Sequence, residues 1–241
     1  MNITIHQPSY LPWIPFLEKG LQSDVYVMLD QVQFEKNSEL NRNRIKTVRG
    51  EIWLTVPVKR RLHTLLSEVR IATEEPWKRK HRRAIEENYR EAPSFEKIAP
   101  TVFDLIEGAG ESLLDLNLAL DELFLRWSGF EGRIVRASEL DAPGTGSERI
   151  LNLCQALGGT KYFSGAGGLD YLDLSSFADA NIEVVFQRYQ HQEYSQRFPA
   201  LGFLSHLSAL DLFMNLGVGP SVRQFILSNA RWVTADAAAC L

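Results

Sequence analysis

The chain has 241 residues, 45% of them hydrophobic, which is enough to build the core of one large domain or two small ones. Its formal net charge of −4 gives no general attraction to nucleic acid, so no nucleic-acid partner is expected. Cys154 and Cys240 lie far apart without metal-site spacing, and no run approaches the ~18 apolar residues of a membrane span. Together with an N-terminus that lacks a signal-peptide pattern, this favours a cytoplasmic protein with free thiols and no membrane span.

The N-terminal region predicts a strand–helix–strand unit. A β-branched strand is expected to end near His6, a helix with a proline in its first turn to run to Gly20, and a second strand to cover residues 24–30. In an open parallel sheet, ligands bind beyond the carboxyl ends of the strands. The polar residues that follow the two strands, and that we therefore expect at a site, are His6, Gln7, Tyr10, Asp30, Gln31 and Gln33.

Two basic segments follow. Residues 43–58 predict a β-hairpin, and it begins beside Asn41, Arg42 and Arg44, whose amide and guanidinium groups suit a phosphate, a carboxylate or a sugar. An exposed strand edge would explain the same pattern. A helix over residues 76–89 carries Lys80 and His81 as candidate anion ligands, although a solvated basic face is the alternative interpretation.

The remaining elements favour one Rossmann-like α/β domain. Two packing helices are expected at 95–107 and 113–127, so that residues from about 76 to 130 form a helical insertion. The alternation then resumes with strands at 133–137, 161–164 and 182–187, and with helices at 147–157, 171–180, 207–216 and 221–229. We expect a three-layer domain over residues 1–230 with a mostly parallel sheet, followed by a tail over 231–241. The glycine-rich turn after residue 164 can present backbone N–H groups to an anion, or simply permit the turn.

Several motifs together resemble the WbqC-like family, bacterial proteins met in polysaccharide and O-antigen gene clusters. They are HQPSYLPW, SDVYVMLDQVQF, NRNRIK, WLTVPV, KYFSGAGGLDYLD, YSQ and LSALDLFMNLG, in this order from His6 to about Gly217. The resemblance implies a role in surface-polysaccharide synthesis without naming a reaction. The polar positions that it carries over are His6, Gln7, Tyr10, Asp30, Gln33, Asn41, Arg42, Arg44, Ser164, Gly165, Tyr171, Gln187, Tyr194, Gln196 and Asp211. Pro15 departs from the glycine expected there.

A second resemblance concerns architecture alone. The opening strand, His-containing loop and helix are similar to those of pantothenate synthetase and other nucleotidyltransferase-type Rossmann enzymes. Those enzymes use a pair of histidines to hold triphosphate, whereas Ser9 and Tyr10 stand where the second histidine would be. An ATP-using ligase is therefore kept as an alternative, and the sequence identifies no cofactor and no metal site.

The leading hypothesis is a transferase of acyl or aminoacyl type acting on a nucleotide-linked or carrier-linked amino sugar, forming an amide or an ester. His6 would be the general base, with Asp30 and Tyr10 as its catalytic partners, all lining one cavity with Arg42. Substrate binding is assigned to Gln7, Trp13, Gln33, Asn41, Arg42, Arg44, Lys80, His81, Ser164, Gly165, Tyr171, Gln187, Tyr194 and Gln196. The alternative class is a non-catalytic sugar-binding or nucleotide-binding subunit of a partner enzyme, in which tryptophans stack on the ligand.

Overall fold

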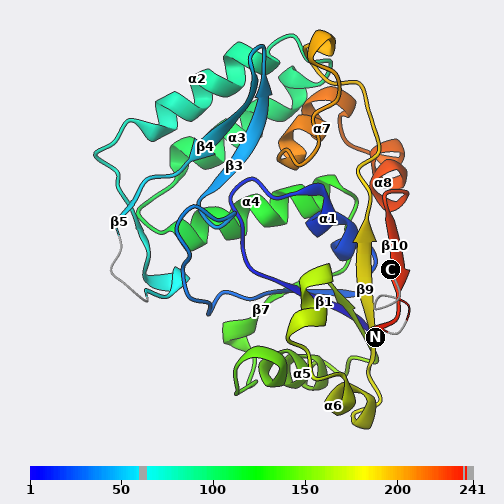
Figure 1. The fold of residues 1–241 in the computed structure, drawn as a ribbon. Helices are drawn as coiled ribbons and strands as arrows, with labels where there is room; N and C mark the ends of the chain where they lie inside the picture. Colours follow the sequence, from blue (N-terminus) through cyan, green and yellow to red (C-terminus); the bar gives the residue numbers. More distant parts are fainter. Residues whose placement is uncertain (60–63, 236, 238–241) are drawn as a thin grey trace.

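A six-stranded sheet forms the centre of the computed structural model, which describes residues 1–59, 64–235 and 237 (Figure 1). Its strands are β1 (Asn2–His6), β2 (Val25–Met28), β7 (Arg133–Arg136), β8 (Lys161–Ser164), β9 (Glu183–Tyr189) and β10 (Ala230–Val233). They are arranged in the order β10-β9-β8-β1-β2-β7, and every neighbouring pair is parallel except β9 and β10. The predicted α/β class with a mostly parallel sheet is confirmed.

Side-chain alternation explains why the sheet is covered on both faces. In β2, Val25 and Val27 belong to one hydrophobic cluster, whereas Tyr26 and Met28 belong to the other. The first cluster contains residues of α5 (Gly146–Ala156) and α6 (Leu174–Asp179). The second contains residues of α1 (Ile14–Leu21), α4 (Leu113–Trp127) and α8 (Pro220–Leu227). Helices therefore lie on both sides of the sheet, as Figure 1 shows.

Helix α1 packs closely against its neighbours because of Gly20. A Cβ atom at this position would lie 2.6 Å from Leu125 of α4 and 3.2 Å from Tyr26 of β2. A side chain at this position would force Leu125 and Tyr26 to shift, so the glycine allows α1 to pack close to α4 and the sheet. This close packing fixes the direction of the neighbouring side chains of α1.

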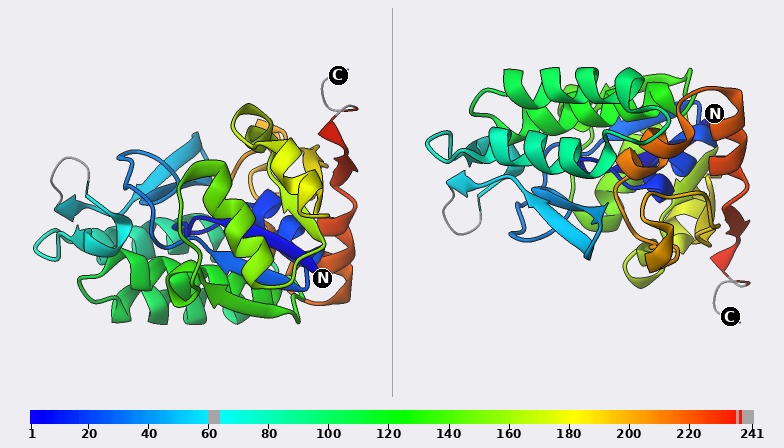
Figure 2. Two further views of the ribbon diagram at one scale, coloured as in Figure 1. Left: turned by 90° about the horizontal axis from the view of Figure 1, so that it is seen from below. Right: turned by 90° about the horizontal axis from the view of Figure 1, so that it is seen from above.

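The segment between β2 and β7 forms a second layer of structure beside the sheet (Figure 2). It contains β3 (Arg42–Thr47), β4 (Gly50–Thr55), β5 (Val58–Lys59), β6 (Arg70–Ile71), α2 (Trp77–Tyr89) and α3 (Phe95–Gly108) before α4. The predicted hairpin is β3–β4, and the predicted helical insertion corresponds to α2–α4. Helix α7 (Ala209–Leu216) packs against α3 and β3, and short 3-10 helices lie at Leu66–Glu68, Ala137–Glu139, Ala166–Asp170 and Pro199–Leu201.

The C-terminal region differs from the expected tail. Residues 230–233 form β10 and pair antiparallel with β9. Trp232 packs edge-on against Phe163, with ring centroids 4.8 Å apart, and its Nε1 donates to a carboxylate oxygen of Glu18 at 3.1 Å. These are contacts with distant parts of the chain, which the local sequence does not reveal. The rest of the tail prediction, including Cys240, falls largely outside the described residues.

No helix within the described ranges is both long and apolar enough to cross a membrane.

Candidate functional site

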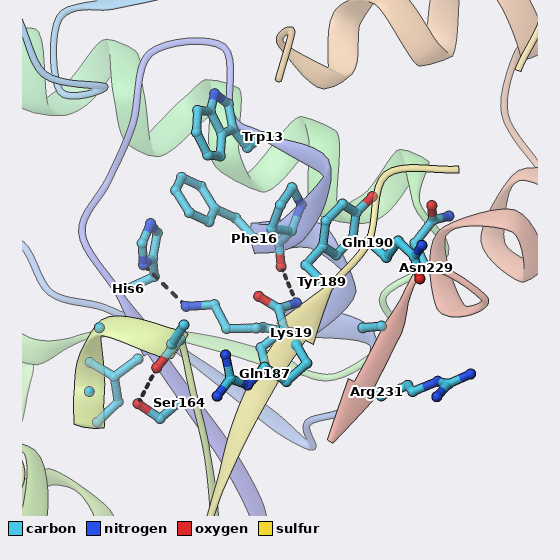
Figure 3. Close-up of a pocket in the computed structure, with 18 of the residues that line it drawn as sticks. His6, Trp13, Phe16, Lys19, Ser164, Gln187, Tyr189, Gln190, Asn229 and Arg231 are labelled. Carbon is cyan, nitrogen blue, oxygen red and sulfur yellow. Dashed lines mark hydrogen bonds between the residues drawn. The ribbon is translucent and has the colours of Figure 1, made fainter. Parts of the chain in front are cut away.

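The sheet has one point where the direction of strand addition reverses. From the central strand β1, the chain adds β2 and then β7 on one side, and later adds β8, β9 and β10 on the other. In open α/β sheets, ligands bind beyond the carboxyl ends of the strands at such a switch point. A cavity of about 850 Å³ lies there, between the ends of β1 and β8 and beside β9 and α1 (Figure 3).

His6 is the last residue of β1 and lies on the wall of this cavity. Its ring packs on Phe16, with ring centroids 3.6 Å apart, and its Nδ1 lies 3.3 Å from Nζ of Lys19. Burial and the neighbouring Lys19 charge lower the pKa of His6 well below its usual value. The imidazole is therefore neutral at pH 7.

Lys19 projects from α1 into the same cavity, and Figure 3 shows its ammonium directed at the His6 ring. The residue is only 3% exposed. Burial lowers its pKa to about 8, against the opposing effect of the Glu18 charge. Among the described residues, no carboxylate lies within ion-pair distance of the ammonium. Lys19 is thus a buried cation whose hydrogen-bond partner among the described residues is the neutral ring of His6.

Glu18 is held on the other side of α1 and does not line the cavity. It is fully buried, and its carboxylate accepts hydrogen bonds from Gln22, Gln187 and Trp232 at 2.9, 2.6 and 3.1 Å. Burial raises the pKa of Glu18, and these three donors oppose that rise. Two of these donors, Gln187 on β9 and Trp232 on β10, hold the Glu18 carboxylate and fix α1 to the sheet, while Lys19 faces the cavity.

The glycine-rich turn after β8 forms the floor next to Lys19. Gly165 has an ordinary φ of −69°, and a Cβ built there would lie 3.8 Å from Nζ of Lys19. At Gly168, an added Cβ would collide with the hydroxyl of Ser164. A side chain at Gly168 would thus meet the Ser164 hydroxyl, whereas at Gly165 the lysine Nζ is the one atom that an added Cβ would contact.

Aromatic rings form the opposite part of the cavity wall. Trp13 lies 5.8 Å from His206 between ring centroids, and His206 lies 4.2 Å from His191, which in turn lies 4.8 Å from Tyr189. Burial, together with His206 and Arg44, lowers the pKa of His191 to about 4. Neighbouring rings meet at angles of 49° to 79°, so they present both faces and edges to the cavity, which suits contact with a sugar or a base.

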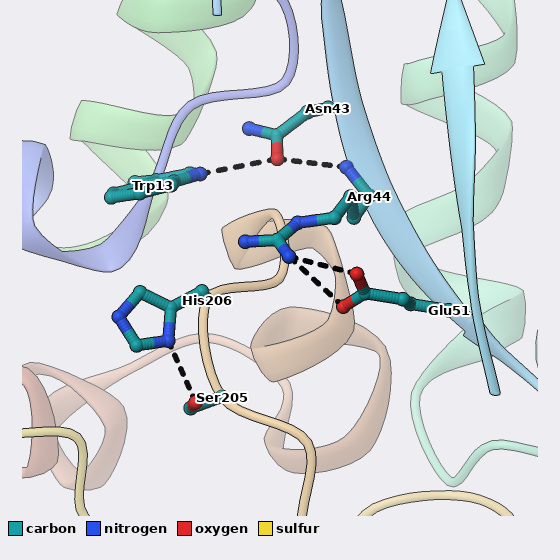
Figure 4. A network of polar contacts seen from close by, with 6 residues as sticks. All are labelled: Trp13, Asn43, Arg44, Glu51, Ser205 and His206. Atoms are coloured by element: carbon teal, nitrogen blue, oxygen red, sulfur yellow. Dashed lines mark hydrogen bonds and ion pairs between the residues drawn. The ribbon is translucent and has the colours of Figure 1, made fainter.

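The orientation of Trp13 is set by the hairpin. Its indole Nε1 donates to Oδ1 of Asn43 at 3.1 Å, and the same oxygen accepts from the backbone N–H of Arg44 (Figure 4). The Arg44 guanidinium forms a two-point contact with the Glu51 carboxylate at 2.8 and 3.1 Å. The hairpin therefore supports the cavity wall through Asn43, while the charge of Arg44 is paired with Glu51.

The structure brings together part of the residue set expected from the sequence. Those that line the cavity are His6, Gln7, Trp13, Ser164, Gly165, Tyr171 and Gln187. Those that do not line it are Tyr10, Asp30, Gln33, Asn41, Arg42, Arg44, Lys80, His81, Tyr194 and Gln196. Of the four residues expected to share one cavity, His6 is in it and the other three are elsewhere. The catalytic roles given to Tyr10 and Asp30 stay predictions without contact to the cavity.

Tyr10 and His81 form a buried pair away from the sheet edge. The carbonyl of Thr55 can only accept, so His81 donates to it from Nε2 at 3.1 Å and accepts from the Tyr10 hydroxyl at Nδ1, at 2.7 Å. Burial lowers the pKa of His81 to about 4, opposed by the contact with Thr55. This neutral chain of hydrogen bonds joins the first loop to α2 and β4.

Asp30 follows β2 but turns away from the switch point. Its carboxylate accepts from the backbone N–H and the hydroxyl of Ser138 at 3.0 and 2.5 Å, next to the end of β7. Arg42 stacks on Trp53, with its guanidinium carbon 4.0 Å from the ring centroid, and Lys80 is exposed on α2. Asn41 is buried and donates to the carbonyl of Val56, and Gln33 forms an isolated bridge with Leu65.

Tyr194 and Gln196 belong to a buried network around Asp211. The Asp211 carboxylate accepts from the hydroxyls of Tyr89 and Tyr194 at 2.7 Å each and from Gln196 at 2.9 Å. Lys46 donates a hydrogen bond to Gln196 and does not line the cavity. Because residues 190–192 and His206 line the cavity, this network fixes the segment that carries part of its wall.

Sequence reasoning missed several cavity residues, above all Lys19. Others are Phe16, Arg188, Tyr189, Gln190, His191, His206, Asn229 and Arg231. Glu18 and Lys19 are adjacent in a short helix and both are buried, which no helical periodicity predicts. The sequence signal that could have been used is the Glu18–Lys19 pair, because two adjacent charged residues followed by a glycine are unusual on a packed helix. The described residues contain no group of three His, Cys, Asp or Glu placed to hold a metal ion.

Comparison with known proteins places the chain in a family. A sequence model of the WbqC-like protein family matches residues 7–221, so the chain belongs to this family. An uncharacterized protein of Mycobacterium tuberculosis (strain ATCC 25618 / H37Rv), Rv1507c, is 32% identical over 220 residues, which cover 90% of this chain and 94% of the relative. No solved structure matches the chain.

Proposed function

We propose that this WbqC-like protein is a transferase that forms an amide or an ester on a nucleotide-linked or carrier-linked amino sugar, at the switch-point cavity. The observation that carries the proposal is the contact of His6 with Lys19 on the wall of a cavity at the expected ligand position of an α/β sheet. The family's association with polysaccharide gene clusters supports the sugar as substrate.

The walls of the cavity suit such a substrate. Amide side chains from Gln7 and Gln190 line it and can bond to sugar hydroxyls, whereas the amides of Gln192 and Asn229 are bonded to Ser228, Phe225 and the backbone of Gln192. Trp13 and Tyr189 offer apolar ring faces to the same space. A mixture of amides and rings is the usual means of holding a ring with hydroxyl edges and apolar faces.

In this proposal His6 acts at the transferred group, either as a hydrogen-bond donor or as a general base. A neutral imidazole has one lone pair and one N–H. While Lys19 is protonated it donates to Nδ1, which puts the ring hydrogen on Nε2, and Nε2–H can stabilise the carbonyl oxygen that gains charge during acyl transfer. General-base catalysis by His6, as expected from the sequence, needs the lone pair on Nε2 and hence a neutral Lys19.

A turnover assay tests the proposal. The purified protein is incubated with nucleotide-linked amino sugars and with acyl-thioester or aminoacyl donors, with and without ATP, and the product mass is followed. The expected result is a sugar that gains the mass of the acyl group, with much slower formation by His6→Ala. Saturable sugar binding without turnover for any donor would instead support a non-catalytic binding subunit.

A further inference from the structure

The charge on the cavity wall is opposite to that of the whole protein. The formal net charge of the chain is −4, yet the described residues that line the cavity include the cations Lys19, Arg188 and Arg231 and no aspartate or glutamate. Low-dielectric walls that carry one sign of charge concentrate the field in a cavity and attract the opposite ion. The cavity thus favours an anionic ligand although the protein does not.

Lys19 is the innermost of these cations. It is 3% exposed, whereas Arg231 is exposed and Arg188 is half-buried. An ammonium has three N–H groups, and the described residues supply the acceptor Nδ1 of His6 for one of them. A buried charge is normally compensated by an opposite charge or a full set of hydrogen bonds. An anion that enters the cavity would provide both.

The space next to Lys19 is kept open by the turn after β8. Gly165 places no side chain over the ammonium, and its φ of −69° is one that any residue could adopt. The absence of a side chain there is therefore not a demand of the backbone. It leaves room beside Nζ at the place where β8 ends and the ligand space begins.

We propose that Lys19 and the main chain at Gly165 form a subsite for a phosphoryl group, so that the ligand binds with its diphosphate against Lys19 and its ring portion toward Trp13. Phe16 defines this direction because its ring contacts Trp13 on one side, at 5.9 Å, and the Lys19 ammonium on the other, at 5.6 Å. The ammonium is a compact point charge that binds phosphate without the planar geometry of a carboxylate clamp. The choice of a phosphoryl ligand rests on the proposed function, in which the sugar is linked to a nucleotide or a carrier.

The subsite replaces the anion ligands expected from the sequence. Arg42 stacks on Trp53, Arg44 is paired with Glu51, and Lys80 is exposed on α2, outside the cavity. Lys19 is the residue in the right place for this role.

Binding of inorganic pyrophosphate, uridine diphosphate and geranyl diphosphate, measured by calorimetry on the full chain, tests the inference. Lys19→Met should weaken all three by about tenfold or more, the usual effect of losing a hydrogen bond to a charged group. Gly165→Ala, which places a methyl group 3.8 Å from Nζ, should weaken them in the same direction. The matched control is Lys97→Met on the exposed surface of α3, which should change affinity by less than about twofold.

The three probes distinguish the source of the phosphate. Tighter binding of uridine diphosphate than of pyrophosphate points to a nucleotide, and tighter binding of geranyl diphosphate points to a lipid-like carrier. The inference is overturned if the parent binds none of them at millimolar concentration, or if Lys19→Met is folded and binds them as the parent does. Anion binding that depends on Lys19 without any turnover would leave the subsite in place and remove the transferase. Turnover combined with anion binding that does not depend on Lys19 would support the transferase and remove the subsite.

Discussion

Nζ of Lys19 lies 3.3 Å from Nδ1 of His6, and this contact joins α1 to the carboxyl end of β1 on the wall of the cavity. Burial lowers the pKa of both groups, to about 8 for Lys19 and well below its usual value for His6. Near neutral pH the pair therefore carries a single positive charge, on the lysine. A change in either residue alters the protonation of the other, which makes the pair accessible to measurement.

Replacing His6 by alanine should slow turnover by roughly 10²- to 10⁴-fold, the usual size of a proton-transfer contribution. His6 ends a strand and faces the cavity, so the melting temperature should change little. Turnover and melting are measured on the same preparation. A variant that melts normally and still turns over within a few-fold of the parent would remove His6 from the reaction.

The pH dependence of kcat/KM separates the two roles of His6. If Nε2–H donates to the transferred group, the active form needs protonated Lys19, and kcat/KM should fall as the pH rises through about 8. If His6 is a general base, the active form needs neutral Lys19 and the value should rise over the same interval. The donor role is the expected outcome, and a rising limb would establish the base.

The affinity for sulfate should also report the charge on Lys19. Sulfate does not titrate near neutral pH, so a change in its affinity comes from the protein. The ammonium form binds it, and the affinity should fall as the pH rises through about 8. In Lys19→Met this decrease should disappear. A parent profile without a decrease between pH 7 and 9 would contradict a sulfate ion bound at Lys19.

Lys19→Met should stabilise the protein without ligand. The pKa of Lys19 is about 8 in the folded state against 10.5 for a free lysine, so the unfolded state binds more protons between these values. The free energy of unfolding of the parent should accordingly rise with pH from 8 to 10.5, relative to the variant. At pH 7 the variant should be more stable, by up to on the order of 3 kcal/mol. Urea unfolding at several pH values provides the measurement.

The Asp211 network should be important for stability. Asp211→Ala leaves the hydroxyls of Tyr89 and Tyr194 without their acceptor, and each unpaired buried group costs about 1–3 kcal/mol. We expect a loss of roughly 3 kcal/mol in the free energy of unfolding. Asp104→Ala, at an exposed position of α3, is the matched control and should change it by less than about 0.5 kcal/mol. Equal effects of the two changes would contradict the importance of the network.

Local sequence patterns were sufficient for most of the elements. The β-branched run before His6, the proline at the start of α1 and the turn at Gly50 each specify backbone conformation over a few residues. The rule that ligands bind beyond strand ends in a parallel sheet then led to His6 and Gln7, which line the cavity, but also to Tyr10 and Asp30, which do not. Ser164 and Gly165, which the family resemblance carried over, line the cavity as well. Such inferences succeed because they need only neighbouring residues and a general property of the fold.

Only the tertiary structure decided which strand ends meet. The sequence suggested a site shared by β1 and β2, but the switch point lies between β1 and β8, because β8 joins the sheet from a remote part of the chain. Asp30 therefore accepts a hydrogen bond from Ser138 beside β7 and is separated from His6. The burial of Lys19 depends in turn on Gly20 against α4 and on Glu18 held by β9 and β10. Contacts of this kind form between residues far apart in sequence, so they cannot be predicted from the residues that surround Lys19 in the chain.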